Sequence, residues 1–265
     1  MKHFFVVGNP IEHSLSPKLH NYWLKNNNIQ ASYEKKLLRK ENIKDLFSEI
    51  RANNISGVNV TLPFKKLVIP LVDDLTSIAK EAQSVNTIYK LNGKVIGDNT
   101  DVGGFQTALE KIKYKYKDKK VLILGAGGVV PSIIIALKRL MVGEIFISNR
   151  TKDNADLLKK KFTNLNIIDW GKLCDFDIII NATSIGLNND NGIKLDNLKN
   201  PSGKLFYDLI YNPSKTQFLL DGEKSGALVE NGKLMFIHQA QLAFQIWHGI
   251  KPLVDDKTIK LLEND

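Results

Sequence analysis

The stretch over residues 119–151 constrains the fold of this chain more than any other. Residues 121–124 form a continuous apolar run, as expected of a strand buried on both faces of a parallel sheet, and a glycine-rich turn ends it abruptly. A helix is predicted over residues 129–140 and a second strand over residues 144–148. This order of strand, glycine turn, helix and strand predicts a dinucleotide-binding α/β unit.

The glycine turn has a chemical purpose in such a unit. Glycines at the junction let backbone N–H groups approach a pyrophosphate at the helix N-terminus, where unpaired amides and the helix dipole both favour an anion. The third small position of the fingerprint is Val130, which is expected to push the helix and the strand slightly apart. An ordinary tight turn is the alternative. The residues expected to bind the cofactor here are Gly125, Ala126, Gly127, Gly128 and Val129.

The end of the second strand predicts which dinucleotide is bound. In an NAD-binding fold, an acidic residue at this point accepts hydrogen bonds from the ribose 2′-hydroxyl. Here the strand runs into Asn149, Arg150, Thr151 and Lys152, and the first acid is Asp153. Because Arg150 offers a 2′-phosphate a planar, permanently charged donor fork, we expect NADP to be preferred. The alternative is that Arg150 merely caps a surface turn.

Composition limits the possible classes of protein. With 265 residues, 43% hydrophobic and 25% charged, the chain resembles a soluble globular protein of one large or two modest domains. The net charge of +9 could attract nucleic acid, but the basic residues are scattered except over residues 111–120. We interpret that run as a solvated linker or helix end and expect no nucleic-acid partner. A positive field would still help to attract a phosphorylated cofactor or a carboxylate substrate.

Several other functional classes are not expected. The single cysteine, Cys174, excludes an internal disulfide, and no Cys/His cluster has metal-ligand spacing, so no metal is predicted. The chain enters a short strand over residues 4–7 almost at once, without a signal peptide, and no apolar run approaches the length of a membrane span. A cytoplasmic location follows by default.

The first hundred residues repeat a strand–helix–strand rhythm, which indicates a second α/β domain. After the first strand, Ser14 and Ser16 stand beside a helix expected over residues 18–26. Ser16 can cap this helix, with Pro17 at its first position, but capping does not explain Ser14. Two hydroxyls at this place could instead clamp a carboxylate.

Lys65 and Asp101 are candidates for acid/base chemistry. Pro63 is expected to open a helix with Lys65 in its first turn, where the helix dipole and the neighbouring Lys66 would both favour the neutral amine. The alternative for Lys65 is an ordinary solvated lysine. Asp101 follows a β-hairpin predicted around Asn92-Gly93, and it can either cap the next helix or partner an amine such as Lys65.

Two further buried strands are expected over residues 178–180 and 205–211. Small and polar residues follow the first of them, at the carboxyl end where open α/β sheets bind ligands. In a helix near the C-terminus, Gln239 interrupts an apolar stripe. A buried amide needs a partner, which is either structural or a ligand.

These motifs, taken together, resemble those of the shikimate dehydrogenase family over nearly the whole chain. The motifs that carry the resemblance are Ser-x-Ser-Pro at 14–17, Asn-Val-Thr-Leu-Pro-Phe-Lys at 59–65, Val-Asn-Thr at 85–87, Asn-Thr-Asp at 99–101, Gly-Ala-Gly-Gly at 125–128, Asn-Arg-Thr at 149–151, Asn-Ala-Thr-Ser at 181–184, Tyr-x-Pro at 211–213 and Gln-Ala at 239–240. The resemblance implies a substrate domain of residues 1–101 plus 238–265 and a Rossmann-type NADP-binding domain of residues 102–237. It also implies reversible reduction of 3-dehydroshikimate to shikimate by NADPH, in a monomer or homodimer.

The resemblance further implies roles for single residues. Lys65 and Asp101 would meet at the reacting oxygen as the catalytic pair. The residues that would bind the substrate are Ser14, Ser16, Thr61, Lys65, Asn86, Asp101, Tyr211 and Gln239. The residues that would bind the cofactor, besides the glycine loop, are Asn149, Arg150, Thr151, Leu209 and Gly232.

The chain departs from the family pattern in a few places. Gln83-Ser84 replaces a Gly-Ala pair, Leu187 stands where methionine is usual, and Asn154 stands where a second arginine is frequent. The family also has paralogues that take quinate and use NAD. Another alternative is a non-catalytic protein that binds a dinucleotide to sense redox state, for which Lys65 and Asp101 would be superfluous.

Overall fold

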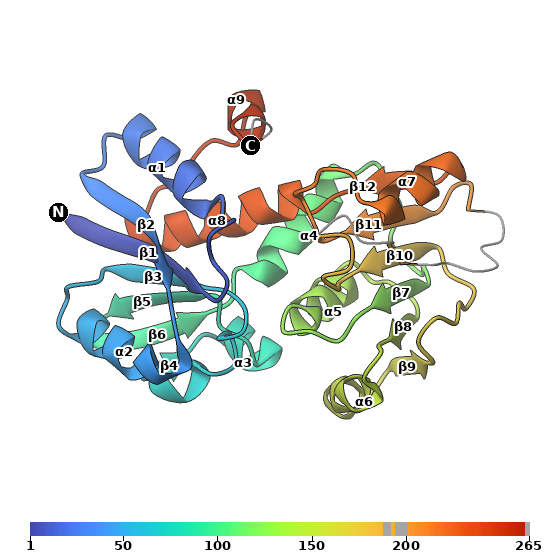
Figure 1. The fold of residues 1–265 in the computed structure, drawn as a ribbon, viewed down its shortest axis with the longest axis horizontal. Helices are drawn as coiled ribbons and strands as arrows, with labels where there is room; N and C mark the ends of the chain where they lie inside the picture. The colour runs from blue at the N-terminus through green and yellow to red at the C-terminus, as the bar shows by residue number, and fades with distance from the viewer. Residues whose placement is uncertain (188–191, 194–200, 263–265) are drawn as a thin grey trace. The chain divides into compact units, whose positions relative to one another are not determined.

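The computed structural model describes residues 1–187, 192–193 and 201–262 of the chain. These residues form two compact units, one made of Met1–Gly104 together with the chain from Ile237 onward, and the other of Phe105–Phe236 (Figure 1). Each unit contains one β-sheet with helices, so the prediction of an α/β chain is confirmed. Within the described residues, no helix is long and apolar enough to cross a membrane.

The sheet of the first unit has the strand order β2-β1-β3-β5-β6-β4. Its strands are β1 (Lys2–Gly8), β2 (Ala31–Leu37), β3 (Gly57–Val60), β4 (Asp74–Leu75), β5 (Thr87–Leu91) and β6 (Lys94–Asp98). β1 is parallel to both β2 and β3, whereas β5 is antiparallel to β3 and to β6. The helices of this unit are α1 (Ser16–Asn26), η1 (Lys40–Asn42), α2 (Ile43–Arg51), η2 (Ile69–Leu71), α3 (Ser77–Ala82) and α9 (Asp256–Lys260). Two helices, α4 (Asp101–Lys111) and α8 (Lys233–His248), pass from one unit to the other.

The hairpin of β5 and β6 forms where the sequence predicts it. Asn92 and Gly93 connect the two strands with positive φ angles of 49° and 80°. Such angles give a turn whose twist matches that of the flanking strands, and asparagine followed by glycine adopts them readily.

The sheet of the second unit is parallel throughout and has the order β12-β11-β10-β7-β8-β9. Its strands are β7 (Val121–Leu124), β8 (Ile145–Ser148), β9 (Leu165–Ile168), β10 (Ile178–Asn181), β11 (Leu205–Asp208) and β12 (Leu228–Glu230). Its other helices are α5 (Val130–Arg139), α6 (Lys152–Lys161) and α7 (Gln217–Lys224). The chain moves outward from β7 to β9 and then restarts at β10 on the other side of β7. The switch point, where such sheets bind ligands, therefore lies between β7 and β10.

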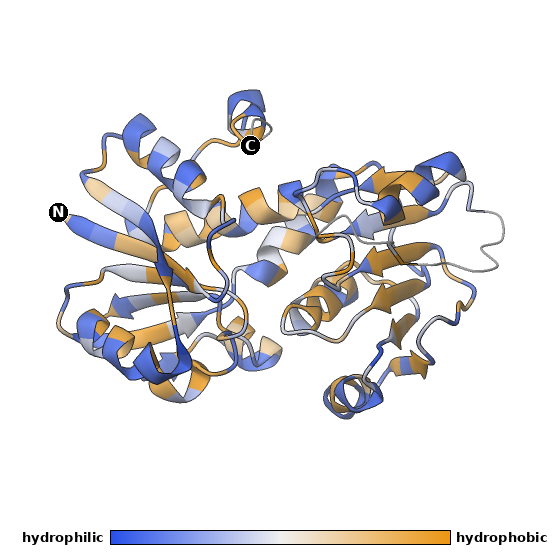
Figure 2. Cartoon of the chain, in the orientation of Figure 1, coloured by the Kyte–Doolittle hydropathy of each residue, from blue (hydrophilic) through white to orange (hydrophobic). Residues whose placement is uncertain are grey.

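Each sheet has its own hydrophobic core. In the first unit, Val58 and Ile88 of the sheet pack with Phe47 and Ile50 of α2. In the second, Phe206 of β11 packs against α7, and Figure 2 shows the strands as largely hydrophobic. Strands buried on both faces have this continuous apolar pattern, which explains why the sequence predicts them well.

An aromatic cluster joins α1 and α8 to the sheet of the first unit. The His20 ring stacks on Tyr33 of β2, with centroids 4.1 Å apart, and lies beside Trp23 and Phe244. The imidazole is only 1% exposed, and neither ring nitrogen has a hydrogen-bond partner among the described residues. Burial, with a smaller effect of the charge on His248, lowers the pKa of His20 to about 3.

A buried neutral histidine predicts a specific pH dependence of stability. In the unfolded chain His20 regains its ordinary pKa of 6.5, so the unfolded state takes up the proton first as the pH falls. The contribution of neutral His20 is therefore fully present above that value and declines towards the folded-state pKa. Relative to His20→Phe, the wild-type protein should lose about 2 kcal/mol of unfolding free energy between pH 7 and pH 5, since one pKa unit corresponds to about 1.4 kcal/mol.

Urea denaturation of both proteins at the two pH values measures this difference, because the titration of groups that do not interact with His20 contributes equally to both. An equal loss of stability in the wild type and in the variant would show that His20 is not held neutral by the fold.

Candidate active site

The topology of the first sheet brings distant polar residues to one edge. β1 and β3 are parallel neighbours, so the segments that follow them, with Ser14 and Lys65, leave from the same edge. Because β5 is antiparallel to β3, it begins at this edge, directly after Asn86. β6 is antiparallel to β5 and returns to the edge shortly before Asp101.

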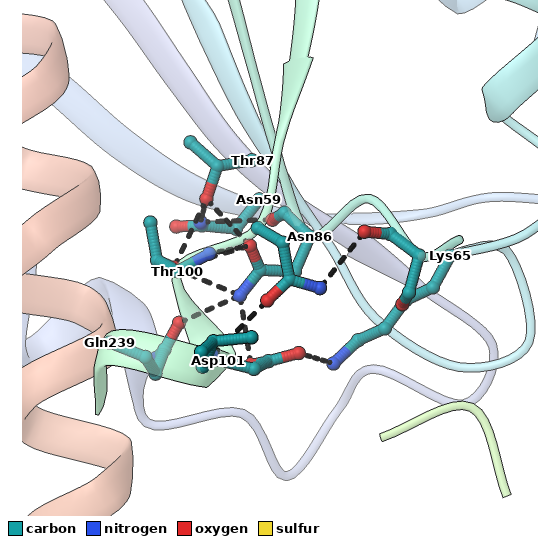
Figure 3. A network of polar contacts seen from close by, with 10 residues as sticks. Asn59, Lys65, Asn86, Thr87, Thr100, Asp101 and Gln239 are labelled. Carbon is teal, nitrogen blue, oxygen red and sulfur yellow. Dashed lines mark hydrogen bonds and ion pairs between the residues drawn. The ribbon is translucent and has the colours of Figure 1, made fainter. Parts of the chain in front are cut away.

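Lys65 and Asp101 form an ion pair at this edge (Figure 3). Lys65 Nζ donates to Asp101 Oδ2 at 2.7 Å, and the two side chains are only 13% and 6% exposed. Lys65 is thus not an ordinary solvated lysine, whereas its neighbour Lys66 is exposed. The Asp101 carboxylate holds the amine at a position largely shielded from solvent, where electrostatic interactions are stronger than in water.

The helix predicted to begin at Pro63 is not formed. Residues 62–68 make turns, and the carbonyl of Lys65 accepts a hydrogen bond from Val85 N at 2.9 Å rather than from Ile69 N, as it would in an α-helix. Proline fixes φ equally well for a turn and for a first helical turn, so the sequence signal was ambiguous. The helix-dipole argument for a neutral amine is therefore wrong, and the segment beside β5 sets the position of Lys65.

Asn86 connects the ion pair to the sheet (Figure 3). Its Nδ2 donates to Asp101 Oδ1 at 2.8 Å, and its Oδ1 accepts from Thr100 N at 2.8 Å. Both oxygens of Asp101 therefore accept a hydrogen bond, one from Lys65 and one from Asn86. This arrangement fixes the rotation of the carboxylate and hence the direction of the amine.

Helix α8 contributes Gln239 to the same group. A Cβ on Gly104 of α4 would lie 2.7 Å from the backbone nitrogen of Gln239, so only glycine permits α4 and α8 to approach this closely. Asn86 Nδ2 lies 3.5 Å from Gln239 Oε1. The amide that interrupts the apolar stripe of α8 thus faces the polar edge of the sheet.

A deeper layer of the network was not anticipated from the sequence. Asn59, in the middle of β3, donates to Thr87 Oγ1 at 3.1 Å and accepts from Tyr33 OH at 2.6 Å. Thr87 in turn donates to Asn86 Oδ1 at 3.0 Å. The available signal was a polar residue inside the buried strand Gly-Val-Asn-Val, since a buried amide requires partners.

Ser14 and Ser16 lie at the start of α1, and the Ser16 side chain does not cap the helix. The helix begins at Ser16, Leu15 occupies the N-cap position, and no side-chain cap hydrogen bond is present. The capping interpretation of Ser16 is therefore wrong. Ser16 N donates to Ser14 Oγ at 3.4 Å, which places the two serines together beside the helix N-terminus.

The glycine loop of the second unit has the shape expected of a phosphate site. Gly125 has a φ of +113°, and a Cβ there would lie 2.8 Å from Ala182 O. At Gly127 and Gly128 a Cβ would meet nothing within 4 Å, so the loop has open space beside it. Val129 is the N-cap residue of α5 and makes no side-chain cap hydrogen bond. These residues fit a dinucleotide pyrophosphate at the helix N-terminus.

The end of β8 presents an exposed arginine. Asn149 Nδ2 donates to Thr151 O at 2.7 Å and so closes the turn. The Arg150 side chain is exposed and makes no hydrogen bond or ion pair with any described residue. Arg150 therefore does not cap the turn, which was the alternative interpretation of this residue.

Leu209 and Gly232 meet in the second unit. A Cβ on Gly232 would lie 2.1 Å from Leu209 O, and Gly232 N donates to Ile210 O at 3.1 Å. Tyr211 stacks on Phe236 with centroids 4.7 Å apart. Tyr211 belongs to the second unit, whereas the other residues expected to bind the substrate belong to the first.

No group of three or more His, Cys, Asp or Glu side chains in the described part of the chain could hold a metal.

A parallel sheet with a glycine-rich loop at its switch point, and a buried lysine–carboxylate pair on a separate α/β unit, define a class: dinucleotide-dependent oxidoreductases. Comparison with known proteins narrows the class. Residues 6–88 match the family model described as the shikimate dehydrogenase substrate binding domain, and residues 106–209 match the model described as shikimate / quinate 5-dehydrogenase.

Individual relatives cover nearly the full chain. A shikimate dehydrogenase (NADP(+)) from Pelagibacter ubique is 56% identical over 262 residues, 99% of each chain. The structure of shikimate 5-dehydrogenase from Thermus thermophilus in complex with NADP(H) and shikimate is 32% identical, with a TM-score of 0.87 over 98% of this chain and 97% of that one. The enzyme from Listeria monocytogenes in complex with shikimate and NAD is 28% identical, with a TM-score of 0.90 over 99% and 96%. The chain belongs to the shikimate dehydrogenase family.

Proposed function

We propose that this protein catalyses the reversible, NADP(H)-dependent interconversion of 3-dehydroshikimate and shikimate. The observation that carries the proposal is the buried pair of Lys65 and Asp101, with Nζ and Oδ2 only 2.7 Å apart. A protein that only sensed the redox state of a dinucleotide would have no use for such a pair. As expected from the sequence, we place this activity in the cytoplasm.

Reduction of a ketone requires a hydride on carbon and a proton on the oxygen, where negative charge develops. NADPH supplies the hydride when it is bound. Lys65 Nζ donates the proton to the oxygen and takes it back in the reverse direction, which is general acid–base catalysis. Asp101 and Asn86 keep the amine oriented, so the donor need not reorganise during the reaction.

The substrate is an anion with several hydroxyl groups, and the polar edge of the first unit suits it. Ser14 and Ser16 donate hydrogen bonds to the carboxylate, beside the N-terminus of α1, which also favours an anion. The residues that hold the hydroxyls and the ring are Thr61, Asn86, Tyr211 and Gln239. In this proposal, residues 1–101 and 238–265 bind the substrate and residues 102–237 bind the cofactor.

The cofactor is NADP, held by its pyrophosphate at the glycine loop and by its 2′-phosphate at the end of β8. Arg150 is free to form a bidentate contact there, and Thr151 and Lys152 lie next to it along the chain. No acid occupies the position at which an NAD-binding strand ends. The NAD complex of the Listeria relative makes the choice of cofactor worth measuring directly.

Replacing the proton donor tests the function itself. Wild-type protein should reduce NADP with shikimate, followed by the absorbance of the reduced nicotinamide, and should do so better than with quinate or NAD. Lys65→Ala should lower kcat by about 10²–10⁴-fold, the usual effect of losing a general acid, with little change in KM for shikimate. Lys66→Ala, which removes an exposed neighbouring charge, is the matched control and should behave as wild type. An effect of Lys65→Ala on KM alone would contradict the proposal.

The two serines are expected to act on substrate binding only. Neither serine occupies the N-cap position of α1, and Ser14 Oγ accepts from Ser16 N only at a long 3.4 Å. Ser14→Ala/Ser16→Ala should therefore leave the fold intact and raise KM for shikimate about tenfold or more, a loss of about 1.4 kcal/mol that two hydrogen bonds to a carboxylate can supply. KM for NADP should not change. Unaltered shikimate binding in titration calorimetry would exclude the carboxylate clamp.

Cofactor preference is expected to depend on Arg150. The wild-type protein should prefer NADP to NAD by at least about tenfold in kcat/KM, and Arg150→Ala should remove most of this preference by raising KM for NADP. Kinetics with NAD should be nearly unchanged. Arg139→Ala, which removes an exposed arginine from the last turn of α5, controls for the change in net charge. A variant that kept its preference would assign the 2′-phosphate to other residues.

A further inference from the structure

A second polar centre lies in the second unit, at the end of β11. Asp208 is completely buried there, and its carboxylate accepts three hydrogen bonds. Oδ1 accepts from Asn181 Nδ2 and from Ile210 N, each at 3.0 Å, and Oδ2 accepts from Thr216 Oγ1 at 2.5 Å. These donors come from three different segments: the end of β10, the loop after β11 and the start of α7.

Two of the donors, Asn181 and Thr216, each fix a further part of their own segment. Asn181 Nδ2 also donates to Ile185 O at 3.1 Å, and Asn181 Oδ1 accepts from Thr183 N at 3.0 Å, so this side chain shapes the loop after β10. Thr216 is the N-cap residue of α7 and accepts from Leu219 N at 3.4 Å. One carboxylate therefore holds two loops and one helix start in register.

The two loops border the residues assigned to the cofactor. A Cβ on Gly125 would lie 2.8 Å from Ala182 O and 3.1 Å from the methyl group of Thr183, so the loop after β10 lies against the glycine turn. In the loop after β11, Ile210 stands between Leu209 and Tyr211, and its carbonyl accepts from Gly232 N. Asp208 itself is too buried to touch a ligand, so it can act only through these neighbours.

The electrostatic setting of Asp208 is unusual for a buried carboxylate. No lysine, arginine or histidine among the described residues pairs with it, and all three of its donors are neutral. Burial raises the pKa of Asp208, while the three hydrogen bonds oppose that change. An ionised carboxylate only accepts hydrogen bonds, so it can serve three convergent donors at once, whereas an asparagine would turn its NH₂ group towards one of them.

We propose that Asp208 is a positioning residue for the nicotinamide half of the cofactor, an inference that rests on the proposed function. A dinucleotide lies across the switch point of a parallel sheet, with its pyrophosphate at the glycine loop. The 2′-phosphate half lies at the end of β8, on one side of β7. The nicotinamide half then extends to the other side, over the ends of β10 and β11, where the segments fixed by Asp208 lie.

Two probes separate this role from a purely structural one. NADPH, titrated by its fluorescence, contacts both sides of the switch point, whereas 2′,5′-ADP, titrated by calorimetry, contacts only the β8 side. Asp208→Asn should weaken NADPH binding about tenfold or more while 2′,5′-ADP binds within about twofold of wild type, because only the nicotinamide side loses its support. Arg150→Ala should weaken the binding of both probes.

A second variant and a matched control keep the test decisive. Thr216→Val removes one donor to Asp208 with little change of shape and should have the same selective effect, even where Asp208→Asn folds poorly. Thr258→Val is the control: Thr258 is fully buried, and its hydroxyl donates to Asp255 Oδ1 at 2.9 Å at the start of α9, in the other unit. It should bind both probes as wild type does.

Equal affinities of wild type and both test variants for NADPH would overturn the inference, as would an equal loss for both probes. If the wild-type protein bound neither probe, the proposed function would fail, and the inference with it.

Discussion

The ion pair between Lys65 and Asp101 is the interaction on which the rest of the candidate active site depends. Removing two charges from water is costly, and their mutual attraction compensates only when the geometry is good and the remaining lone pairs are satisfied. Asn86 meets this condition by donating to the second oxygen of Asp101, and Thr100 in turn holds Asn86. The polar network therefore holds the Lys65 amine in one orientation at a position largely shielded from solvent.

The strand directions of the first sheet make this network possible. If β5 ran parallel to β3, the residue that precedes it would lie at the opposite edge, and Asn86 could not reach Asp101. β5 is antiparallel to both β3 and β6, which therefore run in the same direction, and its insertion between them brings four separate segments to one edge of the sheet. Side chains that lie next to strand ends are held by the sheet itself, so they are placed more rigidly than side chains on a free loop.

Local patterns predicted the central strands of both sheets but not outer elements such as β9 and β12. The wrong predictions arose where a local signal has two meanings. The apolar run before Gly125 and the Asn92-Gly93 turn determine their structures almost alone. Ser16 and Pro63 each fit a helix start. α1 does begin at Ser16, but Leu15 takes the N-cap position. No helix begins at Pro63, where Lys65 O accepts a hydrogen bond from the distant Val85 N. Chemistry suggested that Asp101 meets Lys65, although spacing alone could not show it. Asn59 and Asp208 lie in strands that are buried throughout, so the alternation of polar and apolar residues does not reveal them, and their roles were not predicted.

Each unit contains a buried polar network, and the two networks differ in the charge of their central group. In the first unit the central group is Asn86, which is neutral and both donates and accepts, because the charge of Asp101 is already matched by Lys65. In the second unit the central group is the carboxylate of Asp208, and its three partners are neutral donors. In the proposed function the exposed Arg150 recognises the charge of the cofactor, and the buried carboxylate of Asp208 fixes the shape of the loops.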